Sequence, residues 1–140
     1  MKNIIEKLTQ AQKLAMSTRP KVGGFPYLAE VLRQAGVEKN LWSLPSCQSV
    51  YVIDDGCVVQ QGTPLITGTH TIAKFDQQAL ITALRTDQAG NSTFPEFLQS
   101  TWSAGVIAYT VDFLERKVTY FGAYQESYTE SYPAVEVKIP

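Results

Sequence analysis

The chain of 140 residues has the length of one domain, and its composition of 44% hydrophobic and 18% charged residues excludes intrinsic disorder. Twelve basic and thirteen acidic residues give a formal net charge of −1 without any basic block, which argues against nucleic acid or anionic lipid as a partner. No apolar stretch approaches ~18 residues, and polar residues interrupt the N-terminal segment. We therefore expect a soluble cytoplasmic protein without a signal peptide or membrane span.

Two helices are predicted at the start of the chain. Residues 3–16 form the first, since apolar residues recur at helical spacing from Ile4 to Ala15. The stretch FPYLAEVLRQAGV forms the second, beginning at Phe25 and ending before Gly36. Proline in the first turn needs no hydrogen-bond acceptor, and glycine after the last turn readily adopts the left-handed conformation. Backbone geometry alone therefore accounts for both ends of this second helix.

Three strands are predicted after these helices. They are VEKNLWSL, QSVYVI and CVVQQ, runs rich in β-branched and aromatic residues. Asp54-Asp55-Gly56, between the last two runs, is typical of a tight hairpin turn. Both faces of these strands are partly apolar, so the sequence leaves open which side chains point into the core.

A second pair of helices is predicted after the segment 63–74, which is either a linker or a crossing strand. The first of the pair covers 76–88, with Asp76 as its N-cap. The second is FPEFLQSTWSAGV, where Thr93 and Glu96 have the spacing of a capping box. This second pair therefore repeats the arrangement at the start of the chain.

An antiparallel hairpin is predicted from VIAYTVDF and VTYFGAY near the end of the chain. Pairing Phe113 with Val118 leaves LERK as the loop and places Val111 opposite Tyr120. One face of the hairpin is then apolar and aromatic, as expected for a sheet with one buried side. The stretch ESYTESY is a candidate for a further strand.

The second and fourth predicted helices share the same residues at both ends. Phe25-Pro26 corresponds to Phe94-Pro95, and the Ala-Gly-Val at 35–37 corresponds to that at 104–106. Internal similarity of this kind predicts an α+β fold built from a duplicated unit of helix, helix and β-hairpin, with an approximate internal two-fold.

The two units are expected at about 1–62 and 75–134, joined by 63–74, within a single domain that covers 1–140. A unit of about sixty-five residues would bury too little surface to be stable alone. We therefore expect the two units to share one core, in which helices cover the antiparallel sheet.

The second half, FPEFLQSTWSAGVIAYTVDFLERKVTYFGAYQESYTESYP, resembles the YbcV-like bacterial family of unknown function (domain of unknown function 1398). The resemblance is carried by the FP helix, AGV, the Y-x-V-D-F and T-Y-F-G strands and the E-S-Y…E-x-Y-P tail, over about residues 75–134. Members are similar in length to this chain, and some are labelled "phage envelope protein". The resemblance implies no established enzymatic activity and supplies no catalytic or ligand residues.

Candidate catalytic residues are few. His70 is the only histidine, and it could act as a general base or be an ordinary loop residue. Glu126 and Glu130 are four positions apart on a strand-like stretch, where they could form an acid pair or a solvated face. Cys47 and Cys57 lack the spacing of metal ligands. No nucleotide-binding, nucleophile or metal motif occurs, so we expect neither a cofactor nor a metal.

Aromatic residues concentrate in the last third of the chain. Tyr109, Tyr124 and Tyr128 lie there together with Trp102, which is on the preceding predicted helix. Tyrosine buries its ring and still requires a partner for its hydroxyl. These four residues either belong to the core or line a ligand pocket or interface.

The leading functional hypothesis is a non-enzymatic binding, regulatory or interaction protein. It would take a small molecule or a protein partner at an aromatic-lined cleft or a sheet surface, and it could act as a homodimer. One alternative is a small hydrolase in which His70 meets Glu126 or Glu130. Another alternative, carried only by the family label, is a phage-associated factor.

Overall fold

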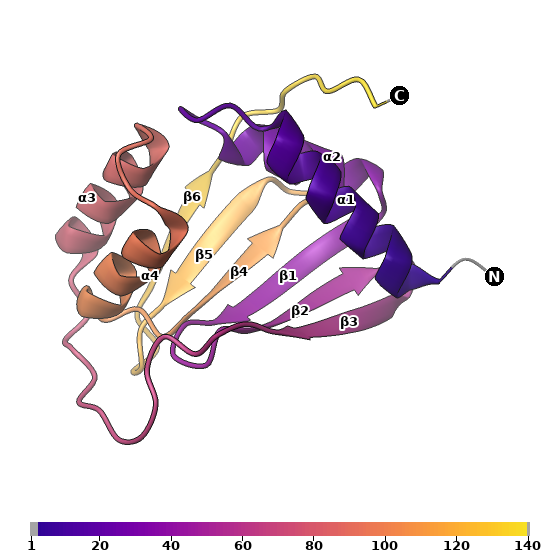
Figure 1. The fold of residues 1–140 in the computed structure, drawn as a ribbon. Coiled ribbons are helices and arrows are strands. Elements are labelled where there is room, and N and C mark those ends of the chain that lie inside the picture. The colour runs from indigo at the N-terminus through magenta and orange to yellow at the C-terminus, as the bar shows by residue number, and fades with distance from the viewer. Residues whose placement is uncertain (1–2, 140) are drawn as a thin grey trace.

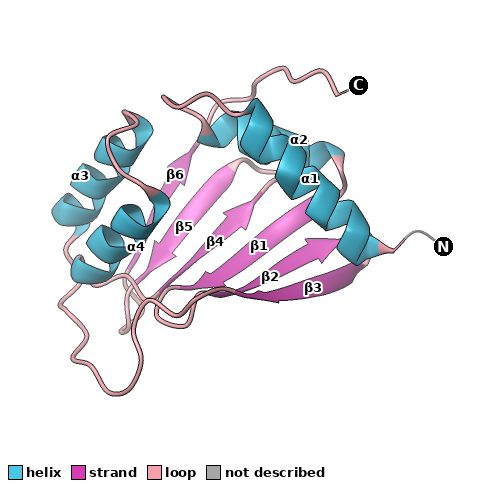
Figure 2. Ribbon diagram, in the orientation of Figure 1, coloured by secondary structure: helices cyan, strands magenta, loops and turns pink. Residues whose placement is uncertain are grey.

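The computed structural model describes residues 3–139 and shows helices packed on one side of a six-stranded antiparallel sheet (Figure 1; Figure 2). The helices are α1 (Ile4–Thr18), α2 (Phe25–Gln34), α3 (Gln77–Gln88) and α4 (Phe94–Ser103). The strands are β1 (Val37–Ser43), β2 (Gln48–Ile53), β3 (Gly56–Gln61), β4 (Ala108–Asp112), β5 (Lys117–Phe121) and β6 (Ser127–Ser131). The predicted α+β class is confirmed. Within residues 3–139, none of the helices has the length and hydropathy that crossing a membrane requires.

The strands lie in the order β3-β2-β1-β4-β5-β6. Two helices followed by three strands occur twice along the chain, and β1 pairs with β4 where the two sets of strands meet. This element order agrees with the predicted alternation of helices and strands. That the two halves arose by duplication of one unit stays a prediction.

Local capping residues determine where the helices begin. The Asp76 side chain accepts a hydrogen bond from the Ala79 amide and caps α3. Thr93 and Glu96 form the reciprocal capping box of α4, with both hydrogen bonds present. Gly36 and Gly105 follow α2 and α4 with φ angles of 101° and 88°. The predicted start and stop signals are thus present in the structure.

The turn between β4 and β5 differs from the prediction. Asp112 pairs with Lys117, so the turn covers 113–116 and the register is shifted by two residues from the predicted pairing of Phe113 with Val118. The Asp112 carboxylate accepts hydrogen bonds from the amides of Leu114 and Glu115, which fixes the turn at this position. A shift by two residues leaves every side chain on its predicted face.

The β1–β3 half contains two irregularities that orient its side chains. Asp54 and Asp55 both have positive φ, 50° and 62°, which is the geometry of a two-residue type I′ hairpin turn. In β1 the pairing with β2 shifts between Val37 and Lys39. This bulge reverses the alternation of side chains, so Asn40 and Trp42 point toward the helices instead of away from them.

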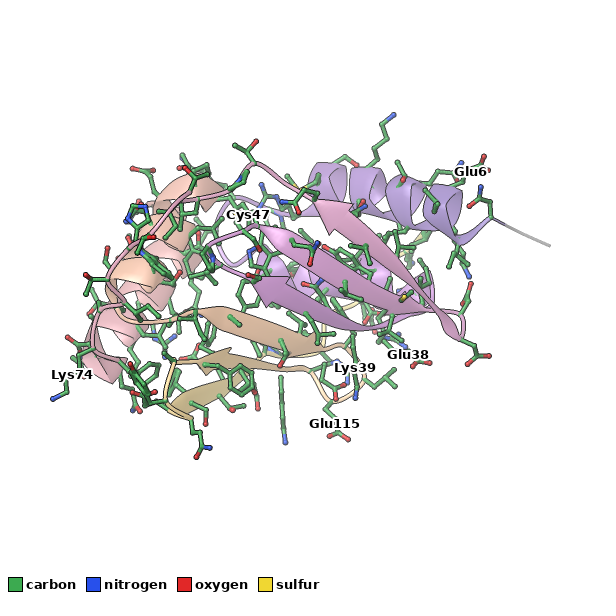
Figure 3. All side chains as sticks on the ribbon, turned by 90° about the horizontal axis from the view of Figure 1, so that it is seen from below. Glu6, Glu38, Lys39, Cys47, Lys74 and Glu115 are labelled. Atoms are coloured by element: carbon green, nitrogen blue, oxygen red, sulfur yellow. The ribbon has the colours of Figure 1, made fainter. Side chains whose placement is uncertain are left out.

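The core lies between the helices and one face of the sheet. Helix α1 packs beside α2 and contacts β3, and α3 packs beside α4. The largest fully buried hydrophobic side chains of the core are Phe113, Leu8, Leu44, Ile53, Leu80, Val31, Val37 and Val106. The opposite face carries no helix, as the view from below in Figure 3 shows. None of the strand residues that point to that outer face is buried.

The joining segment between β3 and α3 contains no helix or strand. It ends with Phe75 crossing directly over Gly105, whose missing side chain leaves room for the Phe75 backbone. The Asp76 amide then donates to the Ala104 carbonyl at 2.8 Å. The prediction left open a linker or a crossing strand, and the segment is an irregular linker that is anchored at its C-terminal end.

Candidate functional site

A row of polar and aromatic side chains crosses the helix-covered face of the sheet. Register pairs place its members side by side on consecutive strands. This central row consists of Gln60, Ser49, Trp42, Tyr109, Tyr120 and Tyr128. The row spans all six strands and therefore runs beneath both helix pairs (Figure 1).

The aromatic rings of the central row pack on one another. The rings of Trp42 and Tyr109 are stacked, with centroids 5.9 Å apart and planes inclined by 15°. Tyr109 contacts Tyr120 at 5.7 Å, and Phe94 of α4 meets Trp42 edge-on at 5.5 Å. Burial raises the pKa of the Tyr109 phenol well above its usual value, with smaller contributions from Tyr120 and Tyr51. These phenols therefore stay neutral at physiological pH.

One end of the central row opens into a hollow of about 450 Å³. Its lining residues are Trp42, Cys47, Ser49, Gln60, Gln61 and Gly62. The Gly62 amide donates to the Cys47 carbonyl at 2.8 Å, which joins the end of β3 to the loop after β1. Cys47 adopts a positive φ of 52°, a strained conformation for a residue other than glycine.

Trp42, which lines the hollow, has a buried indole nitrogen. Trp42 Nε1 is buried, and no hydrogen-bond partner is found for it among residues 3–139. A buried donor without an acceptor costs about 1–3 kcal/mol, so native structures rarely retain one. Ser49 also lines the hollow at 2% exposure, and no hydrogen bond found within residues 3–139 uses its hydroxyl.

None of the described residues that line the hollow carries a charge. The amides of Gln60 and Gln12 of α1 bond each other reciprocally, at 2.9 and 3.1 Å. The Gln61 amide donates to the carbonyls of Ser46 and Gly62. The described lining of the hollow therefore offers a hydroxyl, a thiol and two oriented amides beside the ring of Trp42, whose indole nitrogen is buried.

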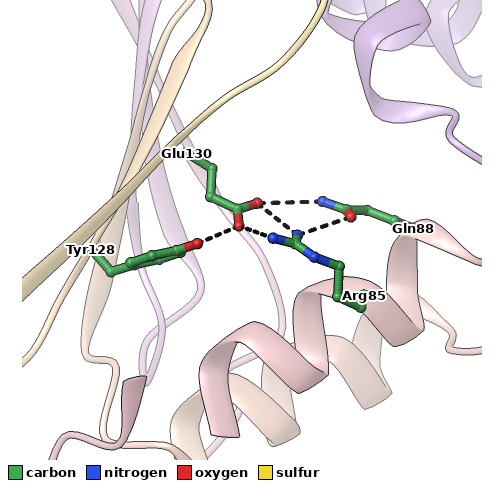
Figure 4. A network of polar contacts seen from close by, with 4 residues as sticks. All are labelled: Arg85, Gln88, Tyr128 and Glu130. Carbon is green, nitrogen blue, oxygen red and sulfur yellow. Dashed lines mark hydrogen bonds and ion pairs between the residues drawn. The ribbon is translucent and has the colours of Figure 1, made fainter. Parts of the chain in front are cut away.

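The other end of the central row is joined to α3 by a polar network (Figure 4). Arg85 donates to both carboxylate oxygens of Glu130, at 3.0 and 2.6 Å, and the Tyr128 hydroxyl donates to the same carboxylate at 2.5 Å. Gln88 adds a longer bond to Glu130 at 3.4 Å. The Arg85 hydrogen bond lowers the pKa of Glu130 from 4.5 despite partial burial. The bond to Glu130 raises the pKa of Tyr128.

We expect Glu130→Gln to destabilise the protein at pH 7 by at most about 1 kcal/mol, since Arg85 is 53% exposed. The pKa of Glu130 is lowered in the folded state, so its contribution exists above the unfolded value of 4.5 and fades as the pH falls through the folded value. Thermal melts at several pH values should therefore show the gap between wild type and variant closing under acidic conditions.

Glu126→Gln is the matched control for this series. Glu126 accepts a hydrogen bond from the Tyr124 amide in its own turn, a bond that a Gln carbonyl can also accept. Its melts should follow those of the wild type. A Glu130→Gln gap that does not change with pH would contradict the role assigned to the Arg85 ion pair.

The residues predicted as a catalytic group have separate local partners. His70 Nε2 lies 2.7 Å from the Thr67 carbonyl in the exposed joining segment. Glu126 bonds within the β5–β6 turn, whereas Glu130 reaches α3. Cys47 is a free buried thiol on the hollow, and Cys57 is a free exposed thiol. Among the described residues, no group of His, Cys, Asp and Glu is arranged to hold a metal ion.

Two of the four residues predicted to bind a ligand lie in the central row, and the other two lie outside it. Tyr109 and Tyr128 belong to the central row, as described above. Tyr124 is 82% exposed at a turn, and Trp102 is partly buried on α4. The sequence did not indicate Trp42, because the bulge in β1 hides its direction from any reading of alternation. It did not indicate Ser49 on β2 either, since both faces of that strand are partly apolar.

Comparison with known proteins gives this chain a family. Three curated proteins are each 52% identical to it over 132 residues, which is 94% of this chain and 80% of each relative. They include uncharacterized proteins Mb2035 of Mycobacterium bovis and Rv2012 of Mycobacterium tuberculosis. A family model described as "Protein of unknown function (DUF1398)" matches residues 13–131. The chain therefore belongs to the DUF1398 family.

Proposed function

We propose that this protein binds a small uncharged ligand in the hollow at the Trp42 end of the central row. The observation that carries the proposal is the buried Trp42 Nε1, a hydrogen-bond donor without an acceptor among residues 3–139, on a side chain that lines a polar hollow. An acceptor atom of a ligand would supply the missing bond. The free energy lost by leaving the donor unpaired is then recovered on binding.

The walls of the hollow restrict the chemistry of the ligand. A charged ligand would meet no counter-ion there, and burying an unpaired charge is costly. Ser49 and the Gln61 side chain can both donate and accept hydrogen bonds. The ring of Trp42, which lines the hollow, favours a flat molecule. These features support a planar, neutral ligand that bears an amide or carbonyl group.

The test uses nicotinamide and benzamide as neutral probes, with nicotinate and benzoate as their charged counterparts. Amide NMR spectra of the protein should shift on titration with the neutral pair around Ser49 and Gly62. The carboxylates should leave those signals in place. Equal binding of both pairs, or no binding by either, would contradict the proposal.

Trp42→Phe is the matched variant, because it keeps a six-membered ring for Tyr109 to stack on and removes the N–H donor together with the five-membered ring of the indole. We expect it to weaken nicotinamide binding about tenfold, the equivalent of one hydrogen bond. Trp102→Phe changes the tryptophan that does not line the hollow and should bind as the wild type does.

The hydrolase alternative has less support. His70 lies against the Thr67 carbonyl and Glu130 forms an ion pair with Arg85, so each of the two side chains has a local partner other than the one that the hydrolase would require. A phage-associated role is carried only by a family label and stays a prediction. The binding proposal agrees with the leading hypothesis drawn from the sequence, but it rests on the Trp42 end of the row, whereas that hypothesis rested on the tyrosines.

A further inference from the structure

The outer face of the sheet is left uncovered by the helices (Figure 3). Register pairs give this face a row of its own that crosses all six strands. This outer row consists of Val59, Val50, Leu41, Thr110, Thr119 and Thr129. Its β1–β3 half is therefore aliphatic, and its β4–β6 half is made of threonine.

The aliphatic half of the outer row faces solvent. Leu41 is 46% exposed and Val59 is 58% exposed, although Leu41 is on a central strand of the sheet. Val52 extends the same patch on β2. A contiguous apolar patch on the outside of a domain usually marks an interaction surface.

Opposite charges meet on this face where β1 pairs with the end of β4, and Lys117 of β5 lies on the other side of Asp112. Lys39 on β1 is directly opposite Asp112 on β4, and both side chains point outward. A two-fold axis parallel to the strands and midway between β1 and β4 would place Lys39 of each copy over Asp112 of the other. The same operation sets Leu41 against Thr110 and Val50 against Thr119 of the second copy. The face is thus complementary to itself in charge at the Lys39 and Asp112 positions.

We propose that the outer face of the sheet is the interface of a homodimer. The two sheets would pack face to face, with Leu41 near the axis and the Lys39–Asp112 pairs repeated on either side of it. Six strands at ~4.8 Å spacing and 5–7 residues in length offer roughly 500 Å² in projection. Such an area is at the low end for stable complexes, so the dimer should dissociate on dilution.

The primary test is sedimentation velocity of the complete chain over a concentration series. We expect the wild type to be dimeric at about 100 μM and to dissociate in the low micromolar range, as the interface size suggests. Leu41→Asp should be monomeric throughout, because it buries two charges at the axis. Val59→Lys, on the edge strand β3, should weaken the dimer and provides a second independent variant.

Ile5→Asp is the matched control, since Ile5 is 59% exposed but lies on α1, on the opposite side of the sheet. It should dimerise as the wild type does. Circular dichroism confirms that each variant is folded. A wild type that stays monomeric at about 1 mM would overturn the proposal. So would a dimer that survives Leu41→Asp or is lost in Ile5→Asp.

The charged pair is tested separately. Lys39→Glu places a carboxylate over Asp112 of the second copy and should weaken the dimer at least tenfold. Adding Asp112→Asn removes the repulsion and keeps an acceptor for the turn amides that Asp112 caps, so the double variant should recover most of the affinity. A double variant no better than Lys39→Glu alone would rule out the two-fold arrangement.

Discussion

Phe113→Ala is expected to destabilise the protein by about 3–5 kcal/mol, the cost of removing a large aromatic side chain from a packed core. Phe113 is 2% exposed and is the largest of the fully buried side chains, although it is the first residue of a hairpin turn. Urea denaturation should show a much lower midpoint with an unchanged slope. Domains are stable by only about 5–15 kcal/mol, so the variant should be near the limit of folding.

The neighbouring residue provides a control for this experiment. Leu114 is 59% exposed in the same turn. Leu114→Ala should therefore change the unfolding free energy by no more than about 0.5 kcal/mol. Similar effects for the two substitutions would mean that Phe113 does not pack in the core as described.

Gly105→Ala is expected to be the second most damaging substitution, at roughly 3 kcal/mol or more. Its φ of 88° costs a residue with a side chain about 1–2 kcal/mol. A Cβ atom at this position would also lie 2.6 Å from Phe75 Cα and 2.8 Å from the Ala73 carbonyl oxygen. These are backbone atoms, so relieving the clash requires the end of the joining segment to move.

Gly23→Ala separates the cost of the positive φ from the cost of the steric clash. Gly23 also has a positive φ, 60°, but a Cβ atom there would meet nothing within 4 Å. It should cost only the conformational part, about 1–2 kcal/mol. Thermal melts of both variants measure the difference, and equal losses would contradict the close approach of Phe75.

Features set by neighbouring residues were predictable from the sequence. The capping box at Thr93 and Glu96 and the N-cap at Asp76 involve atoms within three residues, so their pattern is visible in the letters. The predicted pairing of Phe113 with Val118 was wrong because a side chain, and not the hydrophobic pattern, sets the position of the turn. The Asp112 carboxylate selects the turn at 113–116, and hydrophobic alternation is equally satisfied by either register.

The candidate site was less predictable because it is assembled across strands. Tyr109 and Tyr128 were identified by their aromatic character, but Trp42 joins them only through the pairing of β1 with β4. Ser49 then follows Trp42 across the next strand. The face of the sheet on which Trp42 lies depends on the bulge between Val37 and Lys39. A bulge adds one residue to a strand, and no residue pattern in the sequence indicates it here.

The seam between β1 and β4 has a consequence for how quickly the protein folds. Within each half, successive strands are joined by short turns, and hairpins of this kind form within microseconds. Pairing Asn40 with Val111 must instead close a loop of about seventy residues, which loses far more chain entropy before any contact is gained. We expect this long-range pairing to limit the rate at which the six-stranded sheet appears during refolding.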